Sequence, residues 1–238
     1  MSERAKFSFD FNSFMTNRES AAELTESRYN LTIGLTLAWG FLINFVLVRA
    51  LQPRILEMML YGTGGGMIAF LIAYFVLVMV GSSMVRSYSA VKCFIGYNLI
   101  ALPVGVLVAM ATAMYDPGIV TRAALSTAIV TLVMMIVATA APSIFQRMAG
   151  GLSVALLATI VVEALGSIFF RSVYTITDWV VVGIMCMYIG YDWVRANSVQ
   201  RTTTNAIAAA SALYLDIINI FLRILSILAR SRRDDRGN

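Results

Sequence analysis

Long apolar stretches separated by short polar breaks make up the chain from residue 31 to residue 229. Seven of them have the roughly 20 residues that an α-helix needs to cross about 30 Å of hydrocarbon. These stretches are 31–49, 64–85, 90–114, 119–141, 150–170, 175–194 and 206–229. The pattern therefore predicts an all-α membrane protein with seven transmembrane helices in one domain.

Charged and turn-forming residues mark the breaks between these stretches. They are Gln52-Pro53-Arg54, Arg86-Ser87, Asp116-Pro117-Gly118, Gln146-Arg147, Arg171 and 197–204. Because the breaks are short, consecutive helices should be antiparallel neighbours. The charged residues outside the spans predict a polar N-terminal tail over 1–29, a transmembrane domain over 30–230 and a charged C-terminal tail over 231–238.

Composition agrees with this assignment. The chain is 59% hydrophobic and 13% charged, whereas soluble domains carry about a quarter charged residues. Its mean hydropathy of +0.80 is that of a polytopic membrane protein and excludes a soluble enzyme. The net charge of +5 then reflects loops and lipid-surface contacts, and we expect no nucleic-acid partner. The chain has no histidine, which excludes imidazole relays and histidine metal sites.

The last span contains LYLDIINIFLRIL, in which Asp216, Asn219 and Arg223 interrupt an apolar run. At about 100° per residue, the three lie within about 60° of one another and form one polar stripe. A carboxylate at the bilayer centre costs roughly 2.5–3.5 kcal/mol, so the stripe should face the bundle interior. For Asn219, a hydrogen bond that only fixes helix packing is a sufficient explanation. For Asp216 a functional role is favoured, because a buried carboxylate is a costly way to join helices.

The preceding carboxylate is Asp192, near the end of the sixth span. Across a short antiparallel loop, Asp192 and Asp216 can lie at similar depth. Two carboxyl groups in hydrogen-bond contact in a low dielectric share one proton and form a pH-sensing pair. The spacing equally allows Asp192 to be an interfacial residue paired with Arg195, three positions further on.

Two further charges need partners. Glu163 lies within the fifth span, where it is either a protonated, hydrogen-bonded acid or a cation site that lines a pore. Arg86 ends the second span, where it is either an interfacial arginine that reaches toward water or a counter-ion for the aspartate pair.

Three segments resemble the Bax-inhibitor family, also called the transmembrane Bax-inhibitor-motif family. LYLDIINIF resembles its seventh-helix signature, and YIGYDWVRA resembles the end of its sixth helix. The 24 residues between Asp192 and Asp216 match the spacing of the family's aspartate pair. VRSYSAVKCFIGYNLIALPVG is similar to the junction of its second and third helices, which places Arg86 on the arginine found there. The likeness covers about residues 31–229.

This resemblance implies a central seventh helix surrounded by the other six, in a bacterial inner membrane. It also implies a pH-sensitive calcium leak, in which Asp192 and Asp216 are the proton sensor and candidate calcium ligands. Arg86 would then form a latch with one of the aspartates. Calcium would then be the transported ion, and we expect no resident cofactor.

Two other classes of function compete with the leak. Some bacterial relatives are linked to a membrane-bound quality-control protease, and the N-terminal tail would be the contact; deleting residues 1–28 should abolish that role and spare a leak. An enzyme is not expected, because HExxH, GxSxG and Cys/His pairs are absent from the sequence. Paired intramembrane aspartates also occur in aspartyl proteases, but LYLDIIN lacks the glycine that those proteases place around the catalytic residue.

Overall fold

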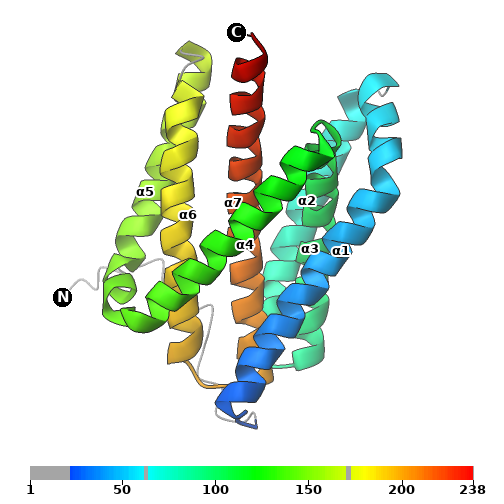
Figure 1. The fold of residues 1–238 in the computed structure, drawn as a ribbon. Coiled ribbons are helices and arrows are strands. Elements are labelled where there is room, and N and C mark those ends of the chain that lie inside the picture. The colour runs from blue at the N-terminus through cyan, green and yellow to red at the C-terminus, as the bar shows by residue number, and fades with distance from the viewer. Residues whose placement is uncertain (1–21, 62–63, 170–172, 238) are drawn as a thin grey trace, which may run out of the picture.

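The computed structural model describes residues 22–61, 64–169 and 173–237, and every regular element in these ranges is an α-helix. The helices are α1 (Glu26–Tyr61), α2 (Gly64–Val85), α3 (Ala90–Ala113), α4 (Pro117–Ala140), α5 (Pro142–Phe169), α6 (Val173–Ser198) and α7 (Thr203–Gly237). They form a bundle in which α7 lies among the other helices (Figure 1). The all-α membrane fold predicted from the sequence is confirmed.

The described residues do not confirm the predicted number of membrane spans. By length and hydropathy, five of the described helices can cross a membrane, namely α1 to α4 and α7. Helix α5 adds a sixth span if its two parts, which meet at a 56° bend after Met148, cross the membrane together. Helix α6 is not among the described spans, and it carries the charged residues Asp178, Asp192 and Arg195. The predicted count of seven is therefore not confirmed.

Several predicted bounds need correction. The break predicted at 52–54 lies inside α1, which continues through Pro53 to Tyr61; membrane helices tolerate such prolines when the freed carbonyl finds another donor. The break at 146–147 lies inside α5, which begins at Pro142, a residue favoured in the first helical turn. Residues 231–237, predicted as a charged C-terminal tail, are helical and continue α7. Of the predicted N-terminal tail, residues 1–21 lie outside the described residues.

Helix α7 is central, as predicted. In the described residues its principal neighbours are α6, α1, α4 and α3, with a smaller contact to α2. Its first half contains Ala206 and the buried run 208–210, whose small side chains let neighbouring helices approach closely. Helix α5 instead packs mainly on α6, in a separate apolar cluster that includes Phe145 and Tyr191. The α6–α7 interface is therefore an interior feature of the bundle.

Hydrogen bonds and an ion pair hold the connection between α6 and α7 in place. The Thr202 hydroxyl accepts a hydrogen bond from the Asn205 amide (3.2 Å) and so caps the start of α7. The amide of Leu24 donates to the Arg201 carbonyl (2.7 Å), and the Arg201 guanidinium lies 3.1 Å from Glu26. These contacts tie the start of α1 to the α6–α7 connection.

Helices α2 and α3 cross at two glycines that leave no room for a side chain. A Cβ atom on Gly81 would lie 2.7 Å from the carbonyl oxygen of Gly96, and a Cβ atom on Gly96 would lie 2.7 Å from the carbonyl oxygen of Gly81. The two backbones are therefore in direct contact, as in other membrane helix pairs joined by small residues. Arg86 directly follows the last residue of α2, so the contact between the two glycines also fixes the position of the Arg86 backbone.

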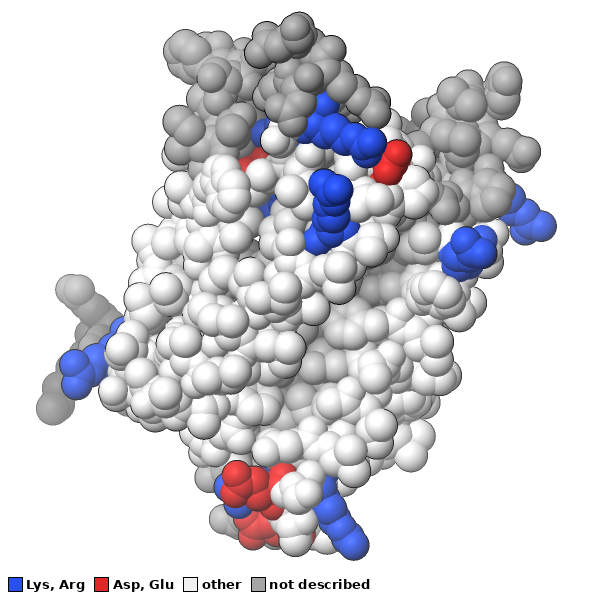
Figure 2. Space-filling view, viewed as in Figure 1, with Lys and Arg blue, Asp and Glu red and all other residues white. Residues whose placement is uncertain are grey.

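The outer surface is typical of a protein embedded in lipid. Figure 2 shows that the centre of the face viewed is free of charged side chains, which lie instead near its upper and lower ends and at its margins. Large apolar side chains such as Ile72, Phe75 and Met79 on α2 and Leu125 and Ile136 on α4 are exposed. An apolar surface this wide is expected where lipid covers it. The protein is a multi-pass integral membrane protein.

Candidate functional site

A row of polar side chains follows one side of α7 over its C-terminal half. Its members are Asp216, Asn219, Arg223, Ser226 and Arg230. Steps of three and four residues keep side chains on one side of a helix, and 14 steps of 1.5 Å make the row roughly 21 Å long. On the neighbouring helix α6, Asp178 and Asp192 are also 14 residues apart. We call the interface that contains these residues the α6–α7 seam.

The aspartate pair, Asp192 and Asp216, lies where α6 and α7 meet. The two side chains hydrogen-bond to each other. Asp192 is buried, and the second carboxyl oxygen of Asp216, Oδ2, is buried without a hydrogen-bond partner. Two carboxyl groups can share a hydrogen bond only when one of them carries a proton. A hydrogen bond between these two side chains therefore requires a proton on one of them.

Neighbouring groups on α6 act on this pair. Tyr188 lies close enough to feel both carboxyl groups, and its hydroxyl hydrogen-bonds with the Ser153 hydroxyl of α5 (3.2 Å). Arg195, itself buried, exerts an electrostatic attraction on Asp192. Of the two arrangements that the spacing left open, Asp192 is set against Asp216, and Arg195 acts on it by electrostatic attraction.

A second charged group lies further along the seam. The Asp178 side chain is 1% exposed, and two arginines of α7 hold it. Arg223 donates a hydrogen bond to Oδ1 of Asp178 (2.8 Å), and Nη1 of Arg230 lies 2.9 Å from Oδ2. Arg230 also donates to the Ser226 hydroxyl, one turn earlier (3.0 Å). This Asp178 cluster (Asp178, Arg223 and Arg230) has two positive charges and one negative charge.

Asp178 is not among the residues that the sequence pattern singles out, although a repeat points to it. Asp178 precedes Asp192 by 14 residues, while Arg223 and Arg230 follow Asp216 by 7 and 14 residues. In antiparallel helices these offsets run in the same direction across the membrane. Once Asp192 is set against Asp216, Asp178 is therefore brought to the level of the arginines.

The position of the Asn219 side chain differs from the predicted one. Its side chain was expected to face the bundle interior, but Asn219 is exposed. The residue is about 60° around the helix from Asp216 and about 40° from Arg223. It thus lies at the edge of the polar row, on a side of α7 that α6 leaves uncovered. Arg223 belongs to the row as predicted, and it pairs with Asp178 instead of Asp216.

The other two predicted site residues are not brought to the pair by any contact described above. Arg86 is exposed in the turn between α2 and α3, and its amide donates to the Ser83 carbonyl (3.2 Å). The latch between Arg86 and an aspartate stays a prediction. The side chain of Glu163, on α5, lies outside the described residues, so its predicted roles are also untested.

The pair can offer a cation only part of a coordination shell. In the described ranges, no group of three or more His, Cys, Asp or Glu side chains is arranged to hold a metal ion. Two carboxylates supply about four oxygens, whereas Ca²⁺ takes about six to eight. Asp192 and Asp216 therefore suit brief contact with a passing, partly hydrated ion better than tight binding.

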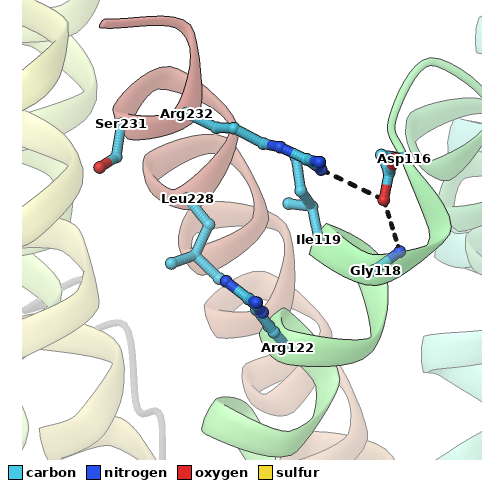
Figure 3. Close-up of a pocket in the computed structure, with 7 residues that line it drawn as sticks. All are labelled: Asp116, Gly118, Ile119, Arg122, Leu228, Ser231 and Arg232. Carbon is cyan, nitrogen blue, oxygen red and sulfur yellow. Dashed lines mark hydrogen bonds and ion pairs between the residues drawn. The ribbon is translucent and has the colours of Figure 1, made fainter. Parts of the chain in front are cut away.

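Two cavities flank α7. One of about 620 Å³ lies between α1, α3, α4 and α7, and its lining is mostly apolar. The other, of about 410 Å³, lies between the start of α4 and the end of α7, where Arg232 reaches across to Asp116 (3.2 Å; Figure 3). Asp116 also accepts the Gly118 amide (2.8 Å), and this hydrogen bond holds the pKa of Asp116 below its usual range. The aspartate pair lines neither cavity.

Comparison with known proteins shows which family the chain belongs to. A search of curated proteins finds no match. A family model described as inhibitor of apoptosis-promoting Bax1 (Bax1-I) matches residues 21–233, which include the aspartate pair, the Asp178 cluster and the whole of α1 to α6. The chain therefore belongs to the Bax1-I family.

Proposed function

We propose that this protein is a pH-sensitive calcium leak of a bacterial inner membrane, with the aspartate pair as its proton sensor. The observation that carries the proposal is the hydrogen bond between Asp192 and Asp216 in the interior of an apolar bundle. This contact needs a proton, so it exists in one protonation state and is lost in another. Membership of the Bax1-I family supports a membrane protein of the Bax-inhibitor type.

Loss of the shared proton has a direct mechanical effect. Two ionised carboxylates repel each other in a low dielectric, so the contact that draws α7 against α6 at this level becomes a repulsion. The ionised pair then attracts cations. Because Ca²⁺ carries two charges, it neutralises the pair better than a monovalent ion does, which supports calcium as the transported ion.

The polar row on α7 offers the route. It extends from Asp216 to Arg230, and Asn219 and Arg223 are at least partly accessible. Ion pathways through membrane proteins are commonly marked by such polar and ionisable residues. Movement of α7 away from α6 would widen the seam along this row.

Arg86 has a place in the same scheme as a counter-ion. The guanidinium is permanently charged, so its attraction for the pair increases when the pair ionises. A latch between Arg86 and one aspartate would then oppose the leak at the pH that favours ion entry. Replacing Arg86 by glutamine should raise calcium flux and leave the flux dependent on pH.

Calcium flux into proteoliposomes, measured over a pH series, tests the proposal. The parent should show flux that changes with pH. Asp192→Asn and Asp216→Asn should each flatten the pH profile, because an amide pairs with the remaining carboxyl group without titrating. Asp116→Asn, which removes an exposed carboxylate near the end of α7, is the matched control and should keep the parental profile.

Two results would contradict the proposal. One is a parent protein that carries no calcium above empty liposomes at any pH. The other is an Asp216→Asn variant whose flux and pH profile equal those of the parent, which would remove the pair from the mechanism.

A further inference from the structure

The cavity of about 410 Å³ between the start of α4 and the end of α7 lies at the edge of the membrane. The candidate membrane span in α4 begins at Pro117, and the one in α7 ends at Arg232. The headgroup layer of a bilayer begins where its hydrocarbon core ends. The cavity is therefore at the depth of the lipid phosphates.

Two guanidinium groups face this cavity, one from each helix (Figure 3). Arg232 reaches across from α7 to Oδ1 of Asp116 (3.2 Å). Arg122, in the second turn of α4, extends toward Leu228 of α7 and has no hydrogen bond or ion pair within the described ranges. Two arginines and one aspartate give the lining a net charge of +1. The cavity therefore suits an anion that carries one negative charge.

The amide groups in the first turn of α4 are already bonded. The Gly118 amide donates to Oδ1 of Asp116 (2.8 Å), and the amides of Ile119 and Val120 donate to the Asp116 carbonyl (2.9 and 3.2 Å). Pro117 has no amide hydrogen. An anion in the cavity would therefore be bound by the arginine side chains and not by the helix N-terminus.

Apolar side chains lead from the cavity toward the middle of the membrane. Ile119 and Leu228 line the cavity beside the arginines. Leu125 and Ile129 follow Arg122 by three and seven residues, which keeps the three side chains on one side of α4. These two residues are 60% and 62% exposed. Arginines at the membrane boundary with exposed apolar side chains beneath them match a lipid, which has a phosphate at that boundary and acyl chains in the hydrocarbon.

We propose that the cavity between α4 and α7 binds the phosphate of an anionic membrane phospholipid, with Arg122 and Arg232 as its ligands. A guanidinium group can donate two parallel hydrogen bonds to phosphate oxygens. Asp116 holds Arg232 over the cavity, and an acyl chain lies on Leu125 and Ile129. A lipid bound in this way joins the end of α7 to the start of α4. The site exists whether or not the protein conducts calcium.

The charge of the lining favours an anionic lipid over a zwitterionic one. The phosphodiester of phosphatidylglycerol carries one negative charge and balances the net charge of the cavity. Phosphatidylcholine has the same phosphodiester but would add a trimethylammonium group beside two guanidinium groups. Like charges at such short distances repel, so phosphatidylcholine should bind more weakly.

Native mass spectrometry of the full chain, with phosphatidylglycerol or phosphatidylcholine of matched acyl chains, tests the proposal. The parent should bind phosphatidylglycerol more tightly than phosphatidylcholine. Arg122→Gln should lower the affinity for phosphatidylglycerol roughly tenfold, because hydrogen bonds to a charged group are lost. Arg122→Lys keeps the charge but loses the paired hydrogen bonds, so its affinity should lie between the two.

Arg49→Gln is the matched control. Arg49 is exposed in the second half of α1, which runs toward the same end of the bundle as the cavity (Figure 1). Like Arg122, it has no hydrogen bond or ion pair in the part of the chain that the structure describes, and it does not line the cavity. Its loss should leave the affinity for phosphatidylglycerol at the parental value. Glycerol 3-phosphate, which has no acyl chains, should displace the lipid poorly.

The possible results separate the lipid from other occupants. Equal affinities of the parent, Arg122→Gln and Arg49→Gln for phosphatidylglycerol overturn the site. Equal binding of the two lipids by the parent overturns the anionic ligand, since apolar contact alone then holds the lipid. Displacement by an equal concentration of glycerol 3-phosphate overturns the lipid in favour of a soluble phosphate. Lipid binding that depends on Arg122, in a protein that carries no calcium, supports this site and overturns the leak alone.

Discussion

The aspartate pair and the Asp178 cluster lie on the same two helices and differ in the sign of their charges. Asp192 and Asp216 have like charges when ionised and are joined only while they share a proton. Asp178 faces two arginines and forms an ion pair with each. One seam thus contains a contact between groups of like charge and a contact between groups of opposite charge.

This difference assigns separate tasks to the two ends of the seam. The Asp178 cluster fixes the C-terminal half of α7 against α6, and the short connection from Ser198 to Thr203 fixes the other end. The pair lies between them, so a change in its contact would act on the part of α7 between two anchors. A movement confined to this part of the helix is easier to reverse than separation of the whole interface.

Loss of Asp178 should have the largest effect on stability. Asp178→Asn should lower the free energy of unfolding by about 3 kcal/mol, toward the lower end for a broken buried ion pair because the arginines are about a third exposed. Unfolding in detergent micelles measures this. Glu26→Gln, which breaks an exposed ion pair with Arg201, should change stability by less than about 1 kcal/mol. Equal losses in the two variants would contradict the proposed anchor.

An uncharged anchor near the pair should have an intermediate effect. The buried Tyr214 hydroxyl, two residues before Asp216, donates to Oδ1 of Asn44 on α1 (2.8 Å). Tyr214→Phe leaves that acceptor without its donor and should cost about 1–2 kcal/mol. In the double variant with Asn44→Leu, part of the loss should be recovered. A loss that is simply additive would show that the two side chains do not act together.

Asp216→Asn should change stability little at low pH. Its main effect should be on how stability depends on pH. Sharing a proton stabilises the folded state below the titration of the pair, and this stabilisation is lost as the pH rises through it. The parent should therefore unfold more easily as the pH rises through this titration. The variant should lack this slope and differ from the parent by less than about 1 kcal/mol at pH 5. Parallel slopes would show that the pair does not titrate in the pH range measured.

Replacing Asp116 should have the smallest effect on stability. The pH dependence of this effect should be opposite to that expected for the aspartate pair. The Gly118 amide lowers the pKa of this exposed carboxyl group, so its stabilising contribution is present above its ordinary pKa and is lost as the pH falls. Asp116→Asn should remove a weak, salt-sensitive loss of stability in acid, measurable as a shift in midpoint between low and high salt. A salt-independent shift would mean that packing at the start of α4 is involved instead.

The sequence predicts those parts of the fold that depend on the local pattern of apolar and charged residues. The predicted spans 64–85 and 90–114 match α2 and α3 within one residue, because charged residues end each apolar run sharply. The spacing of Asp192 and Asp216 across a short connection allows them to pair, but it equally allows Asp192 to pair with Arg195, so spacing alone does not decide between the two. The breaks at 52–54 and 146–147 were less predictable, since proline and polar residues can remain inside a long helix.

Features that depend on how two helices face each other are harder to predict. Asn219 shares a stripe with Asp216, yet a rotation of about 60° is enough to move it from the interface to an exposed position. Asp178 looks unremarkable in TITDWVV, because its partners lie 45 and 52 residues away on α7. Only the relative position of α6 and α7 brings these residues together.

The glycine contact between α2 and α3 has a consequence for the motion of Arg86. With the backbones touching at Gly81 and Gly96, neither helix can roll about its own axis without collision. Helices α2 and α3 should therefore move together as one rigid unit, with Arg86 in the turn that joins them. A displacement of the Arg86 backbone toward the centre of the bundle would therefore move α3 as well, and α3 also packs on α7.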